Sequence, residues 1–273
     1  MLPRSPRPYR LAFAALTITA ASLPVLAIAT SASAQSSVHY VALGDSYSSG
    51  VGAGSYISSS GSCDRSTNAY PALWNGANLP ASYNSVACSG ATTTSVISSQ
   101  LSALSTATTL VSITIGGNDV GFSSVMETCV LNSTSTCVSA IHTAESEIAG
   151  QLPGELDSVL QAVGSHAPSA RVVVLDYPEL YDLSKSSTCI GLSTTDRTDL
   201  DQAADQLDTQ IQAAAGRHGD VFGDVRSAFA GHEICDSASW LHSVNIFDIS
   251  ESYHPTAAGQ SGAYEPVFSS RAS

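Results

Sequence analysis

The sequence is poor in positive charge. Beyond residue 34 it has six arginines and one lysine, Lys185, against all 23 aspartates and glutamates of the chain, a formal net charge of −16. A surface this acidic repels phosphate backbones, which argues against nucleic acid as a partner.

Long apolar runs are also scarce, and the sequence has one, over residues 11–30. A basic leader precedes it, with Arg4, Arg7 and Arg10, and the small residues Ala32-Ser33-Ala34 follow it. This order of charge, apolar core and small residues predicts a cleaved secretory signal peptide over residues 1–34. An uncleaved membrane anchor is the alternative, which Pro24 inside the run disfavours. We therefore expect a secreted, extracellular protein of residues 35–273 with no stable membrane anchor.

The six cysteines lack the spacing of a metal site. None of them forms a C-x-x-C pair and no histidine stands at a ligand spacing from any two, so we expect no metal. An even number of cysteines in an exported chain indicates disulfides, although six allow 15 pairings. We favour the sequential pairing, which closes local loops: Cys63 with Cys88, Cys129 with Cys137, and Cys189 with Cys235.

Neither an internal repeat nor a second domain is indicated, and 239 residues suit a single monomeric α/β domain. Short β-rich runs occupy residues 38–43, 83–87, 110–115, 171–176 and 221–225. Apolar residues spaced by three or four predict helices over 140–163, with Pro153 as a possible break, and over 199–217. Residues 55–62 and 179–198 resemble loops. The alternation predicts a parallel sheet built from βαβ units.

Three potential catalytic groups follow three successive strands. Ser46 follows the first in Gly44-Asp45-Ser46, Gly90 follows the second, and Asn118 follows the third in Gly116-Gly117-Asn118-Asp119. The carboxyl ends of parallel strands share one edge of the sheet, so these groups should converge. Ser46 is then a candidate nucleophile. Its own N–H, the Gly90 N–H and the Asn118 side chain are candidate donors to an oxyanion.

A serine nucleophile needs a base, and His254 is the histidine with a distinctive setting. It lies in Ser252-Tyr253-His254-Pro255, where the proline biases it away from helical angles. A loop histidine held in this way can present its ring to Ser46.

The four blocks, in this order, resemble those of the SGNH (GDSL-type) hydrolase superfamily, and the similarity runs over about residues 38–263. The block V-A-L-G-D-S-Y-S-S-G at 41–50 is especially similar to the exported lipases, esterases and phospholipases A1 of streptomycetes. The resemblance implies a single three-layer, flavodoxin-like domain, with a five-stranded parallel sheet between helices. It also implies hydrolysis of ester or lipid substrates by Ser46, Gly90, Asn118 and His254 without a cofactor, and three sequential disulfides.

One position departs from the pattern of the superfamily. The common D-x-x-H motif has an aspartate where this chain has Glu251. Either the longer Glu251 carboxylate orients the imidazole, or a backbone carbonyl of residues 251–252, such as that of Ser252, accepts the ring N–H. We favour the carbonyl, which would make a Ser–His dyad.

Three other interpretations compete with a lipid esterase. An α/β-hydrolase would carry its serine in G-x-S-x-G, but Ser48 replaces the second glycine. A carbohydrate esterase that deacetylates polysaccharide would use the same catalytic set. A noncatalytic binding module could keep the fold, which the complete set of four residues argues against.

Overall fold

A computed structural model of the chain describes residues 8–9, 36–185 and 189–273. The predicted signal peptide lies outside the described residues, apart from Pro8 and Tyr9. Gln35–Ser273 forms one compact unit, described below.

The centre of this unit is a five-stranded, all-parallel sheet, as the resemblance implies. The strand order is β2-β1-β3-β4-β5. The strands are β1 (His39–Gly44), β2 (Ser82–Ser85), β3 (Leu110–Thr114), β4 (Arg171–Leu175) and β5 (Val221–Gly223). The chain order reverses between β1 and β3, the position at which open α/β sheets bind ligands. The loops after β1, β2 and β3 therefore lie side by side.

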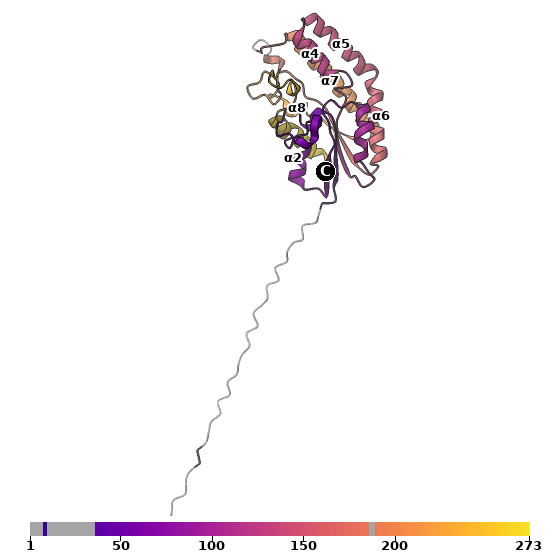
Figure 1. Cartoon of the computed structure of the whole chain (residues 1–273), viewed down its shortest axis with the longest axis vertical. Helices are drawn as coiled ribbons and strands as arrows, with labels where there is room; N and C mark the ends of the chain where they lie inside the picture. The colour runs from indigo at the N-terminus through magenta and orange to yellow at the C-terminus, as the bar shows by residue number, and fades with distance from the viewer. Residues whose placement is uncertain (1–7, 10–35, 186–188) are drawn as a thin grey trace, which may run out of the picture. The chain divides into compact units, whose positions relative to one another are not determined.

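Helices cover both faces of the sheet and make the predicted three layers (Figure 1). One face carries α4 (Phe122–Leu131), α5 (Thr134–Gly150), α6 (Leu152–His166) and α7 (Thr194–His218). The other carries α2 (Tyr70–Asn78), α8 (Arg226–Phe229) and α10 (Glu265–Arg271). Shorter helical segments lie in the loops, among them α1 (Ser46–Ser49), α3 (Thr93–Ser95), η5 (Ile249–Glu251) and α9 (Ala257–Gly259).

The structure corrects several predicted boundaries. The helix expected over residues 140–163 is two helices that meet at Gln151, and Pro153 lies in the first turn of α6, where its missing N–H costs no bond. The predicted loop 179–198 is wrong in its last part. There Ser193 and Asp196 form a capping box that begins α7 at Thr194. Helices α2 and α4 were not predicted.

All three predicted disulfides are confirmed. They join Cys63 to Cys88, Cys129 to Cys137, and Cys189 to Cys235. The first ties the segment before α2 to the loop after β2, and the second joins α4 to α5. Within the described residues, no helix is long and apolar enough to cross a membrane, and no group of three or more potential ligands is arranged to hold a metal ion.

Candidate active site

Ser46 lies at a sharp bend between β1 and α1. At Gly44 the backbone φ is +119°, and a side chain there would overlap the Thr114 carbonyl at the end of β3, so only glycine fits. Asp45 then caps α1 by accepting a hydrogen bond from Tyr47 N at 3.0 Å. Ser46 is the first residue of the helix, so its N–H lies at the helix N-terminus.

The structure brings His254 directly against Ser46. The Nε2 atom of His254 is 2.7 Å from Ser46 Oγ, and Nδ1 is 3.0 Å from the Ser252 carbonyl oxygen. A carbonyl can only accept, so Nδ1 carries the proton and Nε2 presents its lone pair to the serine hydroxyl. The preceding Tyr253 has φ +63°, a left-handed conformation that turns the chain at this point.

The Glu251 carboxylate bonds two other side chains and not the His254 ring. One oxygen accepts a hydrogen bond from Tyr56 Oη at 2.6 Å and the other from Asn245 Nδ2 at 3.1 Å. Of the two groups considered for the His254 ring N–H, the structure therefore places the Ser252 carbonyl within hydrogen-bonding distance. Burial lowers the pKa of His254 to about 4, which keeps the imidazole neutral at physiological pH.

The three candidate oxyanion donors lie in the loops that follow β1, β2 and β3. Asn118 Nδ2 donates to the Ala91 carbonyl at 3.0 Å, which leaves its second hydrogen available, and Asn118 lines a pocket together with Ser46. The Gly90 loop is held beside β1 by a bond from Cys88 N to the Gly44 carbonyl. Among the residues that the structure describes, neither Ser46 N–H nor Gly90 N–H has an acceptor. Both backbone donors are thus unengaged.

An apolar pocket opens beside Ser46 and Asn118 and extends between α4, α5 and α7. Its walls are aliphatic, among them Val125, Ile141, Ile148, Leu200, Ala203 and Leu207. A second groove, the His254 groove, runs between α4 and the segment 244–254. Its walls include Phe122, Met126, Val130, Leu131, Val244 and Ile249, as well as His254 itself. Ser46 and His254 therefore lie between two apolar surfaces.

Comparison with known proteins agrees with this geometry. The GDSL-like lipase/acylhydrolase family matches residues 42–261, most of the chain. The chain belongs to this family. The finding confirms the resemblance seen in the sequence.

Relatives of high identity cover almost the whole chain. Lipase 1 of Streptomyces coelicolor is 54% identical over 262 residues, which are 95% of this chain and 97% of that protein. The crystal structure of phospholipase A1 from Streptomyces albidoflavus NA297 has 56% identity and a TM-score of 0.84, over 86% of this chain and 99% of that one. The extracellular lipase from Streptomyces rimosus has 51% identity and a TM-score of 0.83 over the same shares.

In this GDSL-family chain, two tyrosines connect the loops of the candidate site, and these connections were not predicted from the sequence. Tyr177, directly after β4, accepts a hydrogen bond from Gly117 N at 3.2 Å and donates to Asp45 Oδ2. It thereby joins the loop of Ser46 to the loop of Asn118. Tyr47 donates to the Tyr253 carbonyl at 2.7 Å and so joins the nucleophile helix to the histidine loop. The position of Tyr177 directly after the end of β4 is the sequence signal that could have indicated it as a site residue.

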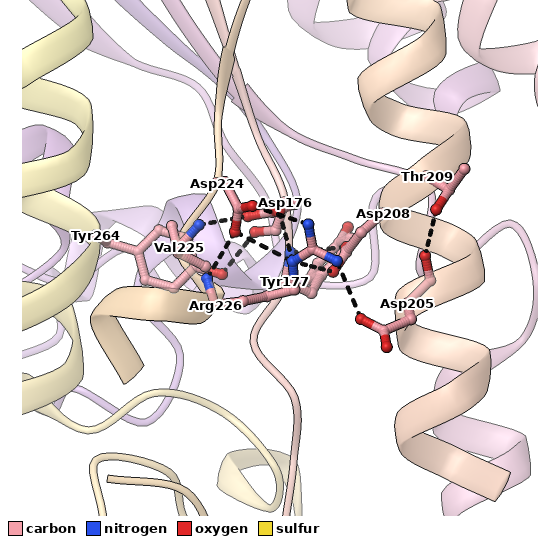
Figure 2. Close-up of polar contacts among 9 residues, drawn as sticks. All are labelled: Asp176, Tyr177, Asp205, Asp208, Thr209, Asp224, Val225, Arg226 and Tyr264. Carbon is pink, nitrogen blue, oxygen red and sulfur yellow. Dashed lines mark hydrogen bonds and ion pairs between the residues drawn. The ribbon is translucent and has the colours of Figure 1, made fainter. Parts of the chain in front are cut away.

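Behind Tyr177 lies a cluster of charged residues, the Arg226 cluster, which Figure 2 shows. Its members are Asp176, Asp205, Asp208, Asp224 and Arg226. Arg226 bonds the exposed Asp205 and Asp224 at 3.0 and 2.8 Å. Its Nε lies 3.6 and 3.8 Å from the buried carboxylates of Asp176 and Asp208. Asp208 also accepts from Tyr177 N, so the cluster supports the element that carries Tyr177.

Proposed function

We propose that this chain is a secreted lipid ester hydrolase of the GDSL type, in which Ser46 and His254 form a catalytic dyad. The observation that carries the proposal is the alignment of Ser46 Oγ, the His254 ring and the Ser252 carbonyl, with contacts of 2.7 and 3.0 Å. A serine bonded to an oriented base is the arrangement that activates a hydroxyl for attack.

In the first half of the reaction, Ser46 Oγ attacks the carbonyl carbon of the ester and its proton passes to His254 Nε2. The negative charge that develops on the carbonyl oxygen is stabilised by the N–H groups of Ser46 and Gly90 and by Asn118 Nδ2. His254 then returns the proton to the departing alkoxide, which leaves as an alcohol. Ser46 is left acylated.

In the second half, water attacks the acyl-enzyme and His254 accepts a proton from it. The tetrahedral intermediate then collapses, the Ser46 Oγ–acyl bond breaks and His254 returns the proton to Ser46 Oγ, which releases the carboxylic acid and restores the Ser46 hydroxyl. The Ser252 carbonyl keeps the same ring tautomer in both halves. A carbonyl stabilises the transient imidazolium less than a carboxylate does.

Two observations support lipids as substrates. The pocket beside Ser46 is lined mainly by aliphatic and aromatic side chains, which suit an acyl chain. The relatives with more than half of their residues identical are named as a lipase and a phospholipase A1.

Export is supported by the composition of residues 1–34 and by a relative described as an extracellular lipase. Sequencing the N-terminus of protein recovered from the culture medium tests this part. We expect the mature chain to begin at Gln35. An intact Met1 in the medium would refute cleavage.

Hydrolysis of a soluble p-nitrophenyl ester tests the catalytic part. Ser46→Ala should abolish turnover, whereas Ser261→Ala, a matched change on the exposed side of the C-terminal helical segment, should leave it unchanged. A panel of phosphatidylcholine, a medium-chain triacylglycerol and acetylated xylan then defines the substrate class. Preference for the xylan would overturn the lipid assignment while leaving the catalytic dyad intact.

A further inference from the structure

Five of the most exposed apolar side chains among the described residues lie in the segments that line the His254 groove and a groove next to it. Ile246, Phe247 and Ile249 are 78, 94 and 67% exposed. Leu131, at the end of α4 on the opposite wall of the groove, is 70% exposed. Ile190 is 98% exposed and lines a further groove, which shares Val130 and Val244 with the first. We call these five residues the apolar rim.

The loop that carries three of them is held in shape by its own polar groups. Asn245 Oδ1 accepts from Phe247 N and Asp248 N at 3.1 and 3.3 Å. Asp248 Oδ1 accepts from Ser250 N and its hydroxyl. The apolar side chains thus project into solvent from a loop whose polar groups are satisfied internally, an arrangement typical of an interaction surface.

The rim is continuous with the catalytic centre. Ile249 and Leu131 line the groove that His254 also lines, and Ser252, whose carbonyl accepts the His254 ring proton, follows directly on η5. Asn245 N donates to Ser252 Oγ at 2.9 Å, which fastens the base of the loop to that residue. Whatever covers the rim therefore covers the entrance to the active site.

The charge of this face limits what can cover it. Of the described residues that line the two grooves, none is Lys or Arg, and the acidic Glu127 is among them. Asp248 and Glu251 lie in the same loop as the rim residues. A surface with apolar side chains and negative charge is repelled by anionic headgroups, so its partner must be apolar without a net negative charge.

We propose that the apolar rim docks on the surface of a zwitterionic phospholipid aggregate and brings the His254 groove to the lipid. This inference rests on the proposed function, since a lipid esterase must meet its substrate in an aggregate. The side chains of Ile246, Phe247 and Ile249 enter the region of the headgroups and acyl chains, and substrate then reaches Ser46 without crossing bulk water.

Vesicle binding tests the proposal. The Ser46→Ala protein, which cannot consume the lipid, is mixed with phosphatidylcholine vesicles, and the bound fraction is measured by flotation. In this background Phe247→Ser should weaken binding roughly tenfold, and the triple change Ile246→Ser, Phe247→Ser, Ile249→Ser about a hundredfold. Leu79→Ser is the matched control, because Leu79 is 75% exposed but precedes the edge strand β2 and lines neither groove. Unchanged binding by the triple variant would overturn the proposal.

The soluble ester separates this proposal from the proposed function. With Ser46 intact, Phe247→Ser, which leaves the wall of the His254 groove unchanged, should hydrolyse p-nitrophenyl acetate within about twofold of the parent. A parent inactive on this ester would refute the catalytic assignment and leave the binding result to stand alone. If Phe247→Ser loses soluble activity as well, Phe247→Trp decides: its emission should shift to the blue with vesicles, and no shift would refute docking.

The dependence of binding on the headgroup charge of the lipid tests whether the partner is a zwitterionic surface. At low salt, phosphatidylglycerol vesicles should bind the protein several-fold more weakly than phosphatidylcholine, and added salt should narrow the difference. Equal or tighter binding to phosphatidylglycerol would contradict the assignment of a zwitterionic surface.

Discussion

The carboxyl ends of β1 and β4 each carry an aspartate, yet the two surroundings differ sharply. After β1, Asp45 takes hydrogen bonds from Tyr47 N, Thr114 Oγ1 and Tyr177, while the adjacent His254 ring is bonded to the Ser252 carbonyl and to no carboxylate among the described residues. After β4, Asp176 is one of four carboxylates around Arg226 (Figure 2). The ion pairs of Arg226 with Asp205 and Asp224 thus support the framework, whereas a neutral carbonyl orients the His254 ring.

The same physical cause, burial, makes these two regions sensitive to opposite ends of the pH scale. Burial disfavours the charged form of each group, so it lowers the pKa of His254 to about 4 and raises the pKa of Asp176 to about 8. For Asp208 the pKa is also raised, by burial first and by the Asp176 charge second. Acid should therefore impair catalysis, and alkali should weaken the framework.

The largest expected effect tests whether the catalytic region works without a carboxylate. His254→Ala should lower kcat on a p-nitrophenyl ester by at least about 10⁴-fold, because Ser46 loses its base. Glu251→Gln should lower it less than tenfold, since this carboxylate bonds Tyr56 and Asn245. If Glu251→Gln lowered kcat several hundredfold, the Glu251 carboxylate would be the third member of a catalytic triad and the dyad would be refuted.

A smaller effect tests whether neutral donors stabilise the oxyanion. Asn118→Ala should lower kcat roughly 10²–10³-fold with little change in KM, because the donor acts on charge that develops in the transition state. Asn118→Asp, of nearly the same shape, should be worse, because it adds negative charge at the same place. A change in KM alone would remove Asn118 from the oxyanion hole.

The sequence could predict those parts of the molecule that local patterns determine. Glycine or proline follows the predicted strands, as at Gly44, Gly116 and Pro178. The loops after β1, β2 and β3 lie together because the carboxyl ends of parallel strands share one edge of the sheet. Helix α4 was missed because its short sequence, with three polar residues in its first six, has no clear periodicity.

Contacts between distant parts of the chain could not be predicted. The direction of the Glu251 carboxylate depends on Tyr56, 195 residues away, and the hydrogen bond from Tyr177 to Asp45 spans 132 residues. The D-x-x-H spacing alone left two possible partners for His254, because either could reach the ring from within the same loop. Only the fold determines which one does.

The acid side of the comparison can be measured from the pH dependence of kcat/KM, which reports the free enzyme. With a His254 pKa of about 4, the base stays neutral at pH 5, where an imidazole with the usual pKa near 6.5 would be about 97% protonated. We therefore expect about thirtyfold more activity at pH 5 than an unperturbed histidine allows. A midpoint near pH 6.5 would show that the base is hydrated in solution.

The alkaline side concerns stability. Between about pH 4, where an unfolded aspartate titrates, and about pH 8, the native Asp176 keeps a proton that the unfolded chain has released. The free energy of unfolding should therefore fall as pH rises through this range, by up to about 1.4 kcal/mol per pH unit for one group. Asp208 is a second buried carboxyl whose pKa is raised, so Asp208→Asn removes its own share of this proton uptake and should flatten the slope by roughly 1 kcal/mol per pH unit.

The control for this last effect is Asp205→Asn, measured by urea denaturation at pH 5, 6.5 and 8 alongside Asp208→Asn. Asp205 bonds Arg226 at 3.0 Å, but its side chain is 49% exposed. Its replacement should therefore lower the free energy of unfolding by no more than about 1 kcal/mol and leave the pH slope unchanged. Parallel slopes in all three proteins would mean that Asp208 is ionised in the native state, as it is in the unfolded chain. Burial of Asp208 beside Arg226 would then have no consequence for the pH dependence of the stability.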